Sequence, residues 1–187
     1  MLLEDFNGAP GDEAAAVVTV WADVPAWADA LVAARPYASV DALVDRAAAE
    51  ASSWGGPELD TALAQHPRIG DTPSGETAEA SASRREQASM AHADADVTTR
   101  IAEGNAAYEA RFGRVFLIRA AGRSPEEMLA ELDRRLGNDD AAEAREACAQ
   151  LAEIALLRIR ATFAGDDAAT APSAPAHRAP APTPKRA

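Results

Sequence analysis

Helical patterns separated by proline and glycine breaks run through most of the sequence. Within each pattern, apolar residues recur three or four positions apart, so they share one face of a helix, as Trp27 and Leu31 do. The breaks, such as Arg35-Pro36-Tyr37 and Trp54-Gly55-Gly56-Pro57, contain the residues that end helices. Helices are predicted at about residues 12–22, 25–34, 40–53, 58–66, 77–91, 96–112, 125–136 and 140–163.

This succession predicts an all-α fold, a single compact domain of about eight to nine helices. Ala, Glu, Arg and Leu dominate, whereas Ile, Tyr and Phe are scarce, and that balance favours helix over sheet. Ser39 is expected to cap one helix, and Ser124-Pro125-Glu126-Glu127 has the form of a capping box. Gly113 is expected to end the helix before it.

Two segments do not follow the helical pattern. Residues 1–12 are predicted to be a short lead-in, with Phe6 against the body of the protein and Asn7-Gly8 as a turn. Residues 115–118 form a continuous apolar run, which is either a buried extended segment or a strand-like connector. Periodicity does not decide between these two readings.

The composition changes after Ala164. Residues 165–187 hold five of the 12 prolines and no Leu, Ile, Val, Phe or Met. Such a segment buries too little apolar surface to offset its ordering entropy. We therefore expect one helical domain at residues 1–164 and a disordered Ala/Pro-rich tail at 165–187.

Charge, cysteine content and hydropathy exclude several classes of protein. A net charge of −12 argues against nucleic-acid binding, which needs a basic face. The single cysteine, Cys148, excludes an internal disulfide and a cysteine zinc cluster, and is expected to be a small buried residue. The N-terminus lacks a secretory signal, and no apolar run is long enough to span a membrane. A cytoplasmic location is therefore expected.

His66 has the most distinctive setting of the three histidines. Pro67 disfavours the α conformation at the residue before it, so His66 is expected where a helix stops and a Gly/Pro-rich loop begins. A side chain there is held by a rigid element yet faces open space, which suits a catalytic imidazole. A His-Pro pair is also an ordinary helix stop, and the pair alone leaves both readings open.

Two further features carry polar chemistry. Ser83, Glu86 and Gln87 lie at positions i, i+3 and i+4 and share one helical face, which is either a solvated surface or part of a site. Arg158 falls on an apolar stripe with Leu151 and Ala155, so it is expected to point inward. A buried arginine needs a partner, which is either an internal carboxylate or an anionic ligand. His66 and His92 show no metal-binding spacing, and no metal is expected.

These stretches together resemble the OHCU decarboxylase family, where OHCU is 2-oxo-4-hydroxy-4-carboxy-5-ureidoimidazoline. The resemblance covers roughly residues 2–163 and rests on several modest motifs in a specific order. They are Phe6-Asn7, Arg35-Pro36-Tyr37, His66-Pro67-Arg68-Ile69-Gly70, Ser83-x-x-Glu86-Gln87, Asn105-x-x-Tyr108-x-x-Arg111-Phe112-Gly113, Phe116-x-Ile118 and Ile154-x-x-x-Arg158.

The resemblance implies an all-α, cofactor-independent carboxy-lyase that converts OHCU to (S)-allantoin in urate breakdown, acting on a small molecule as a homodimer. By motif, His66 would be the catalytic acid or base and Glu86 would assist it, either by orienting His66 or by binding the substrate. The residues implied in substrate binding are Pro67, Ser83, Gln87, Ile118, Arg119, Ala120, Ala121, Gly122 and Arg158.

The sequence departs from the family pattern in two places. Arg114-Val115 stands where the family often has Phe-Pro, and Arg119 stands where a small residue or cysteine is common. If the contacts there are made by the backbone, these changes are silent; otherwise they affect specificity. Two other functions are compatible with the sequence: a decarboxylase of a related ureide, and a non-catalytic helical interaction module on the same scaffold.

Overall fold

In the computed structural model, the described residues are 1–64, 68–70 and 78–164, without the side chains of residues 79 and 92. Nine α-helices and one 3₁₀ helix lie in these ranges, and no strand does, which confirms the all-α fold. The elements are α1 (Leu3–Gly8), α2 (Gly11–Trp21), α3 (Pro25–Ala33), α4 (Val40–Ala51), α5 (Gly56–Leu63), α6 (Ala78–Glu86), η1 (Ala88–His92), α7 (Ala95–Phe112), α8 (Pro125–Arg135) and α9 (Asp140–Thr162). The predicted tail, residues 165–187, lies outside the described residues, so its disorder and the domain boundary stay predictions.

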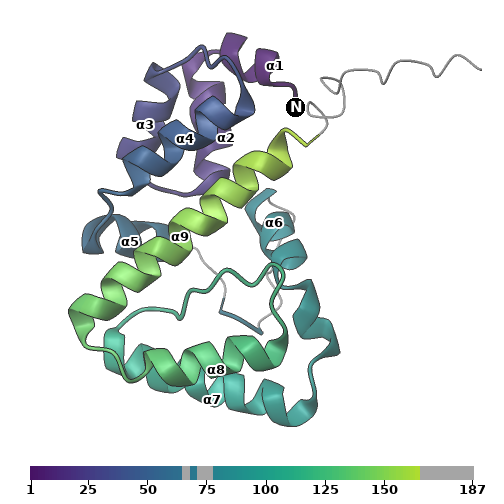
Figure 1. Ribbon diagram of the computed structural model, residues 1–187, viewed down its shortest axis with the longest axis vertical. Coiled ribbons are helices and arrows are strands. Elements are labelled where there is room, and N and C mark those ends of the chain that lie inside the picture. The colour runs from purple at the N-terminus through teal and green to yellow at the C-terminus, as the bar shows by residue number, and fades with distance from the viewer. Residues whose placement is uncertain (65–67, 71–77, 165–187) are drawn as a thin grey trace, which may run out of the picture.

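The long helix α9 connects two groups of helices (Figure 1). At one end α9 packs with α2 and α4, and at the other end it approaches α7 and α8, which lie side by side and run in the same direction. Each group has its own apolar core. The larger core includes Trp21, Leu31 and Leu151, whereas Ile101 and Leu132 belong to the smaller one between α7 and α8.

The first turns of the chain form a short helix, α1, where the sequence predicted an irregular lead-in. Phe6 is fully buried, as expected. Asn7 is held by Tyr37, whose backbone N–H donates to Asn7 Oδ1 at 2.9 Å and whose carbonyl accepts from Asn7 Nδ2 at 2.9 Å. Arg35 donates to the carbonyls of Phe6 and Ala9. The helix therefore depends on partners about 30 residues away, which local pattern does not reveal.

The predicted helix boundaries with specific capping chemistry are confirmed. Ser39 Oγ accepts from the N–H of Ala42 at the start of α4. Ser124 and Glu127 form the predicted capping box before α8. Gly113 ends α7 with a φ of 69°, a left-handed conformation that glycine adopts without a Cβ penalty.

The helix predicted at residues 77–91 is interrupted in the structure. The α-helix ends at Glu86, and the 3₁₀ helix η1 begins at Ala88. Between them Gln87 has a φ of −93° and a ψ of 13°, outside the helical range. No proline or glycine marks this break; Gln87, at the break, makes the long-range contacts described below.

Residues 115–120 run as an extended connector between α7 and α8, without a strand partner in the described part of the chain (Figure 1). Successive side chains of an extended segment point to opposite sides. Leu117 accordingly joins the larger core, while Phe116, Ile118 and Ala120 join the smaller one. Of the two readings that the sequence left open, the buried extended segment is the observed one.

Candidate functional site

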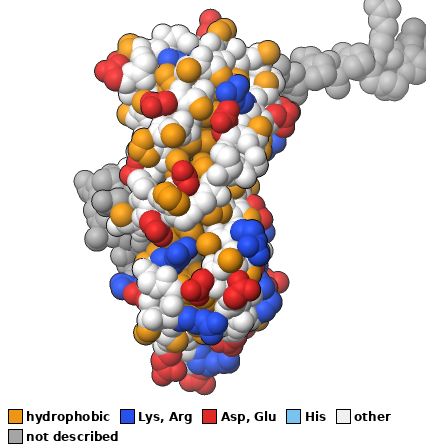
Figure 2. Space-filling model, turned by 90° about the vertical axis from the view of Figure 1, so that its left-hand side faces the viewer, with side chains coloured by type: hydrophobic (Ala, Val, Ile, Leu, Met, Phe, Trp, Pro, Cys, Tyr) orange, Lys and Arg blue, Asp and Glu red, His pale blue; other side chains and the backbone are white. Residues whose placement is uncertain are grey.

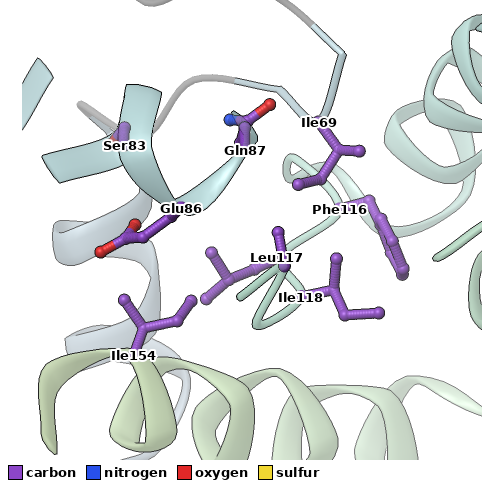
Figure 3. A pocket seen from close by; sticks show the side chains of 9 residues that line it. Ile69, Ser83, Glu86, Gln87, Phe116, Leu117, Ile118 and Ile154 are labelled. Carbon is purple, nitrogen blue, oxygen red and sulfur yellow. The ribbon is translucent and has the colours of Figure 1, made fainter. Parts of the chain in front are cut away.

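A small pocket lies where α6, α9 and the 115–120 connector meet (Figure 3). In Figure 3, Glu86 and Ile154 lie on one side and Ile69, Phe116 and Ile118 on the other, with Leu117 between them. Its free space is about 20 Å³, room for roughly one water molecule, so a ring-sized ligand requires the walls to move apart. The residues that line it are Ile69, Ser83, Glu86, Gln87, Phe116, Leu117, Ile118, Ala120 and Ile154.

Ser83, Glu86 and Arg158 form a hydrogen-bonded cluster at this pocket. Arg158 reaches from α9 to Glu86 on α6, with Nε and Nη2 donating to the two carboxylate oxygens at 2.7 and 2.8 Å. Nη2 also donates to Ser83 Oγ at 3.3 Å, and Nη1 donates to the Val20 carbonyl at 3.0 Å. The partner of the inward arginine is thus an internal carboxylate, one of the two alternatives that the sequence left open.

Burial differs between the two members of this ion pair. The Arg158 side chain is 5% exposed, whereas that of Glu86 is 23% exposed. Figure 3 shows the Glu86 carboxylate pointing away from Phe116. Each carboxylate oxygen accepts one bond from Arg158 and retains a further lone pair. Glu86 is therefore able to accept an N–H or O–H donor from a ligand while it remains bound to Arg158.

Gln87 holds the short segment Arg68–Gly70 against the pocket. Its Oε1 accepts from the Gly70 N–H at 3.0 Å, and its Nε2 donates to the Arg68 carbonyl at 3.4 Å. Both ends of the amide are thus engaged with backbone. The chain leaves the helical conformation at this same residue.

Two residues of α7 hold the same segment from the other side. Asn105, which is buried, donates from Nδ2 to the Ile69 carbonyl at 2.9 Å. Glu109 forms a two-point ion pair with the Arg68 guanidinium. Sequence reasoning assigned no role to either residue, although Asn105 stands in one of the motifs. A contact to a backbone carbonyl leaves no sequence signal in its partner.

The connector contributes only part of the segment that was expected to bind substrate. Ile118 and Ala120 line the pocket, but Arg119, Ala121 and Gly122 are not among its lining residues. The Arg119 side chain pairs with Glu153 at 2.8 Å and donates to the Ala121 carbonyl at 2.6 Å. These contacts engage the Arg119 side chain outside the pocket, while its neighbours Ile118 and Ala120 line it. Gly122 has a φ of 80° and forms the turn into α8.

His66 and Pro67, the predicted acid or base and its neighbour, lie outside the described residues. Along the chain, His66 precedes the pocket-lining residue Ile69 by three positions. In the ranges that the structure describes, no group of three or more His, Cys, Asp and Glu side chains is arranged to hold a metal ion. Nor is any described helix both long and apolar enough to cross a membrane.

Comparison with known proteins gives consistent results. The model of the OHCU decarboxylase family matches residues 7–160. A crystal structure of OHCU decarboxylase in the presence of (S)-allantoin superposes with a TM-score of 0.66 and 26% identity, covering 78% of this chain and 96% of that one. A structure of (S)-allantoin synthase gives a TM-score of 0.63 at 17% identity, covering 87% of this chain and 54% of that one, and supports the fold alone.

A curated relative comes from Arabidopsis thaliana. It is the uric acid degradation bifunctional protein TTL, which is 35% identical over 106 residues. The aligned region is 54% of this chain and 32% of that protein. The chain therefore spans about a third of the length of this relative.

Proposed function

Because the chain belongs to the OHCU decarboxylase family, we propose that it is a carbon–carbon lyase that decarboxylates OHCU to (S)-allantoin in urate breakdown. The observation that carries the proposal is the cluster of Ser83, Glu86 and Arg158 at the pocket between α6 and α9. The pocket combines the partly exposed carboxylate of Glu86 with apolar walls, and a small polar ring needs both. The substrate class is a ureidoimidazoline.

Decarboxylation leaves an electron pair that needs an acceptor. In OHCU, the carbon–nitrogen double bond beside the carboxylated carbon accepts the pair as CO₂ leaves. A proton is then delivered to one face of the ureido-bearing carbon, which gives the (S) product. The protein must hold the ring, let CO₂ depart and position one proton donor.

We propose His66 as that acid or base. Imidazole gives and takes protons near neutral pH. In the sequence, His66 stands three positions before Ile69, which lines the pocket. The Asn105 and Gln87 bonds hold Ile69 and Gly70, in the described segment that follows Pro67 in the sequence. Pro67 is proposed as a wall of the site.

The contacts of Glu86 and Arg158 suggest a division of roles. A tight clamp of Arg158 on the departing carboxylate would stabilise the ground state and slow the reaction. In the structure, the Arg158 fork is occupied by Glu86. We therefore propose that Arg158 orients Glu86, and that Glu86 accepts a hydrogen bond from the substrate hydroxyl or ureido N–H.

The other residues that the resemblance implies belong to α6 and its C-terminal end or to the connector. Gln87 is proposed to act chiefly by holding the Arg68–Gly70 segment, since both ends of its amide bond to that backbone. Ser83 supports Arg158. Ile118 and Ala120 are proposed to contact the substrate along the connector. Arg119, Ala121 and Gly122 are proposed to support these contacts from outside the pocket.

The family resemblance also supports a homodimer in the cytoplasm. Sedimentation equilibrium tests the homodimer, with a mass near twice 19.5 kDa expected. Fractionation of the source cells tests the cytoplasmic location.

Circular dichroism tests the proposed reaction. Urate, urate oxidase and 5-hydroxyisourate hydrolase generate OHCU in the cuvette, and the signal of a single allantoin enantiomer is followed with and without the protein. We expect the protein to accelerate its appearance. An unchanged slow trace would contradict the proposed function and favour an interaction module or another ureide.

His66→Asn tests the catalytic assignment in the same assay. The variant is expected to fold normally and to lose about 10²-fold or more of the rate, the contribution typical of a positioned acid or base. His177→Asn, in the predicted tail, is the matched histidine control and should retain wild-type turnover. Near-wild-type turnover by the His66 variant would remove His66 from the mechanism.

A further inference from the structure

Arg135, on α8, is a fully buried arginine that contacts the wall of the pocket. Its side chain is 1% exposed. Nη1 donates to the carbonyl of Leu117 at 2.7 Å, and the guanidinium lies 4.7 Å from the centre of the Phe116 ring. Leu117 and Phe116 both line the pocket. A cation brought into the core of a small domain at this position needs an explanation beyond helix packing.

The charge of Arg135 is balanced by Glu143, which is also 1% exposed. Arg135 Nε donates to Glu143 Oε1 at 2.9 Å, and Asn138 Nδ2 donates to Glu143 Oε2 at 2.8 Å. The Tyr108 hydroxyl donates to the same carboxylate. Burial, followed by the bond to Glu143, raises the pKa of Tyr108 well above its usual value, so its hydroxyl remains a donor. The network thus connects α7, α8 and α9.

The connector depends on such side chains because it has no strand partner in the described part of the chain. Buried backbone groups must find hydrogen bonds elsewhere. Arg135 satisfies the carbonyl of Leu117, and the Oε1 atom of Gln150, on α9, accepts from the N–H of Arg119 at 3.0 Å. These two bonds lie on either side of Ile118, which faces the pocket.

An ion pair alone would not require an arginine here. The planar fork lets one side chain bind Glu143 with Nε while Nη1 reaches the Leu117 carbonyl. A lysine ammonium is a single point donor and cannot hold this geometry. The guanidinium of Arg135 therefore links the pocket wall at Leu117 to both α8 and α9.

We propose that Arg135 and Gln150 are positioning residues, which fix the Phe116–Ile118 wall where the substrate of the proposed decarboxylase binds. This inference rests on the proposed function. Neither side chain lines the pocket, so both act through the connector. A displaced wall weakens substrate binding and misaligns the ring, and misplacement by about 1 Å costs up to about 10²-fold in rate.

The test is steady-state kinetics with freshly generated OHCU on Arg135→Lys and Gln150→Ala, at a temperature where thermal melts show each variant to be folded. We expect KM to rise and kcat/KM to fall by about tenfold or more in both. Partial unfolding lowers kcat in proportion to the lost protein and leaves KM unchanged, so the split between KM and kcat distinguishes positioning from stability.

Two variants serve as controls. Arg134→Lys changes the adjacent arginine, which pairs with Glu131 and Glu146 at the surface and does not contact the connector. Leu43→Ala destabilises the larger core at a residue of α4 that does not line the pocket. Both should keep the wild-type KM.

The outcomes separate the two proposals. If the wild-type protein does not accelerate (S)-allantoin formation, the proposed function fails. If the wild-type protein is active and the Gln150→Ala and folded Arg135→Lys variants keep its KM, the positioning role is overturned. Should Arg135→Lys fail to fold, Gln150→Ala decides alone, since Gln150 is only half-buried.

Discussion

At the scale of single residues, the Glu86–Arg158 pair shows how unequal burial divides the roles of two charges. Arg158 has almost no contact with solvent, whereas Glu86 retains partial access. A buried charge that loses its partner is costly, but one that can reach water is less so. The consequences of removing either partner are therefore expected to differ.

Glu86→Ala should destabilise the protein more than Arg158→Met does. The first variant leaves a buried guanidinium with only Ser83 and the Val20 carbonyl, a loss of about 3 kcal/mol. The second leaves a carboxylate that can turn to water, and methionine fills the space. Urea unfolding at pH 7 measures both. A larger loss for Arg158→Met would show that the carboxylate is the more deeply buried partner.

Residue identity predicted part of this site and could not predict the rest. The shared face of Ser83 and Glu86 and the inward direction of Arg158 follow from helical spacing, and the structure confirms both. The direction of Arg119 does not follow, because alternation depends on an extended segment that periodicity did not identify. The roles of Asn105 and Arg135 were equally hidden, since each contacts a backbone carbonyl far away in sequence.

At the scale of elements, helix boundaries that depend on local chemistry were predicted well. Boundaries that depend on long-range contacts were not. The capping box and the αL glycine encode their own geometry within a few residues, so the end of α7 and the start of α8 were predicted correctly. Helix α1 and the break at Gln87 depend on partners elsewhere in the chain. Packing between elements adds another constraint, which is visible at Gly104.

Gly104→Ala should destabilise the α7–α8 pair by about 1 kcal/mol. Alanine is the better helix former by about 1 kcal/mol, but the added Cβ would stand 2.5 Å from Leu132 Cδ2. Leu132 is 1% exposed and has little room to shift, so the overpacking cost of about 1–3 kcal/mol prevails. Thermal unfolding measures the change.

A second background separates this clash from other causes. In a Leu132→Ala protein, the same glycine substitution should become stabilising, because the opposing side chain is gone. Gly11→Ala, where a Cβ meets nothing within 4 Å, is the control and should be nearly neutral. Equal effects of Gly104→Ala in both backgrounds would rule out the contact with Leu132.

At the scale of the whole molecule, the two cores adjoin at the 115–120 connector, which contributes residues to both, and the pocket lies at that junction. The sequence predicted one compact domain but not its division into two cores, because both are built from the same helical periodicity. Charge is distributed unevenly over this architecture. On the face of the molecule that Figure 2 shows, most arginines lie in the lower half, beside acidic side chains. That end of the molecule contains α7 and α8.

This distribution leads to a prediction about acid stability. The hydrogen bond from Arg68 lowers the pKa of Glu109 below its usual value. A carboxyl with a lowered pKa in the folded state stabilises that state above its unfolded pKa, near 4.5, and the contribution is lost as pH falls through the folded pKa. The net charge of −12 has the opposite effect, since protonation relieves repulsion.

Glu109→Gln isolates the first effect. Between pH 5 and 3 its unfolding free energy should fall less steeply than that of the wild type, by under about 1 kcal/mol in total because the pair lies near the surface. Urea unfolding at several pH values measures the slope, and Glu103→Gln on the exposed face of the same helix is the control. Identical slopes for Glu109→Gln and wild type would mean that the Arg68–Glu109 pair contributes nothing to the folded state. The expected difference would instead identify acid as a condition that loosens the attachment of Arg68–Gly70 to α7, beside the pocket.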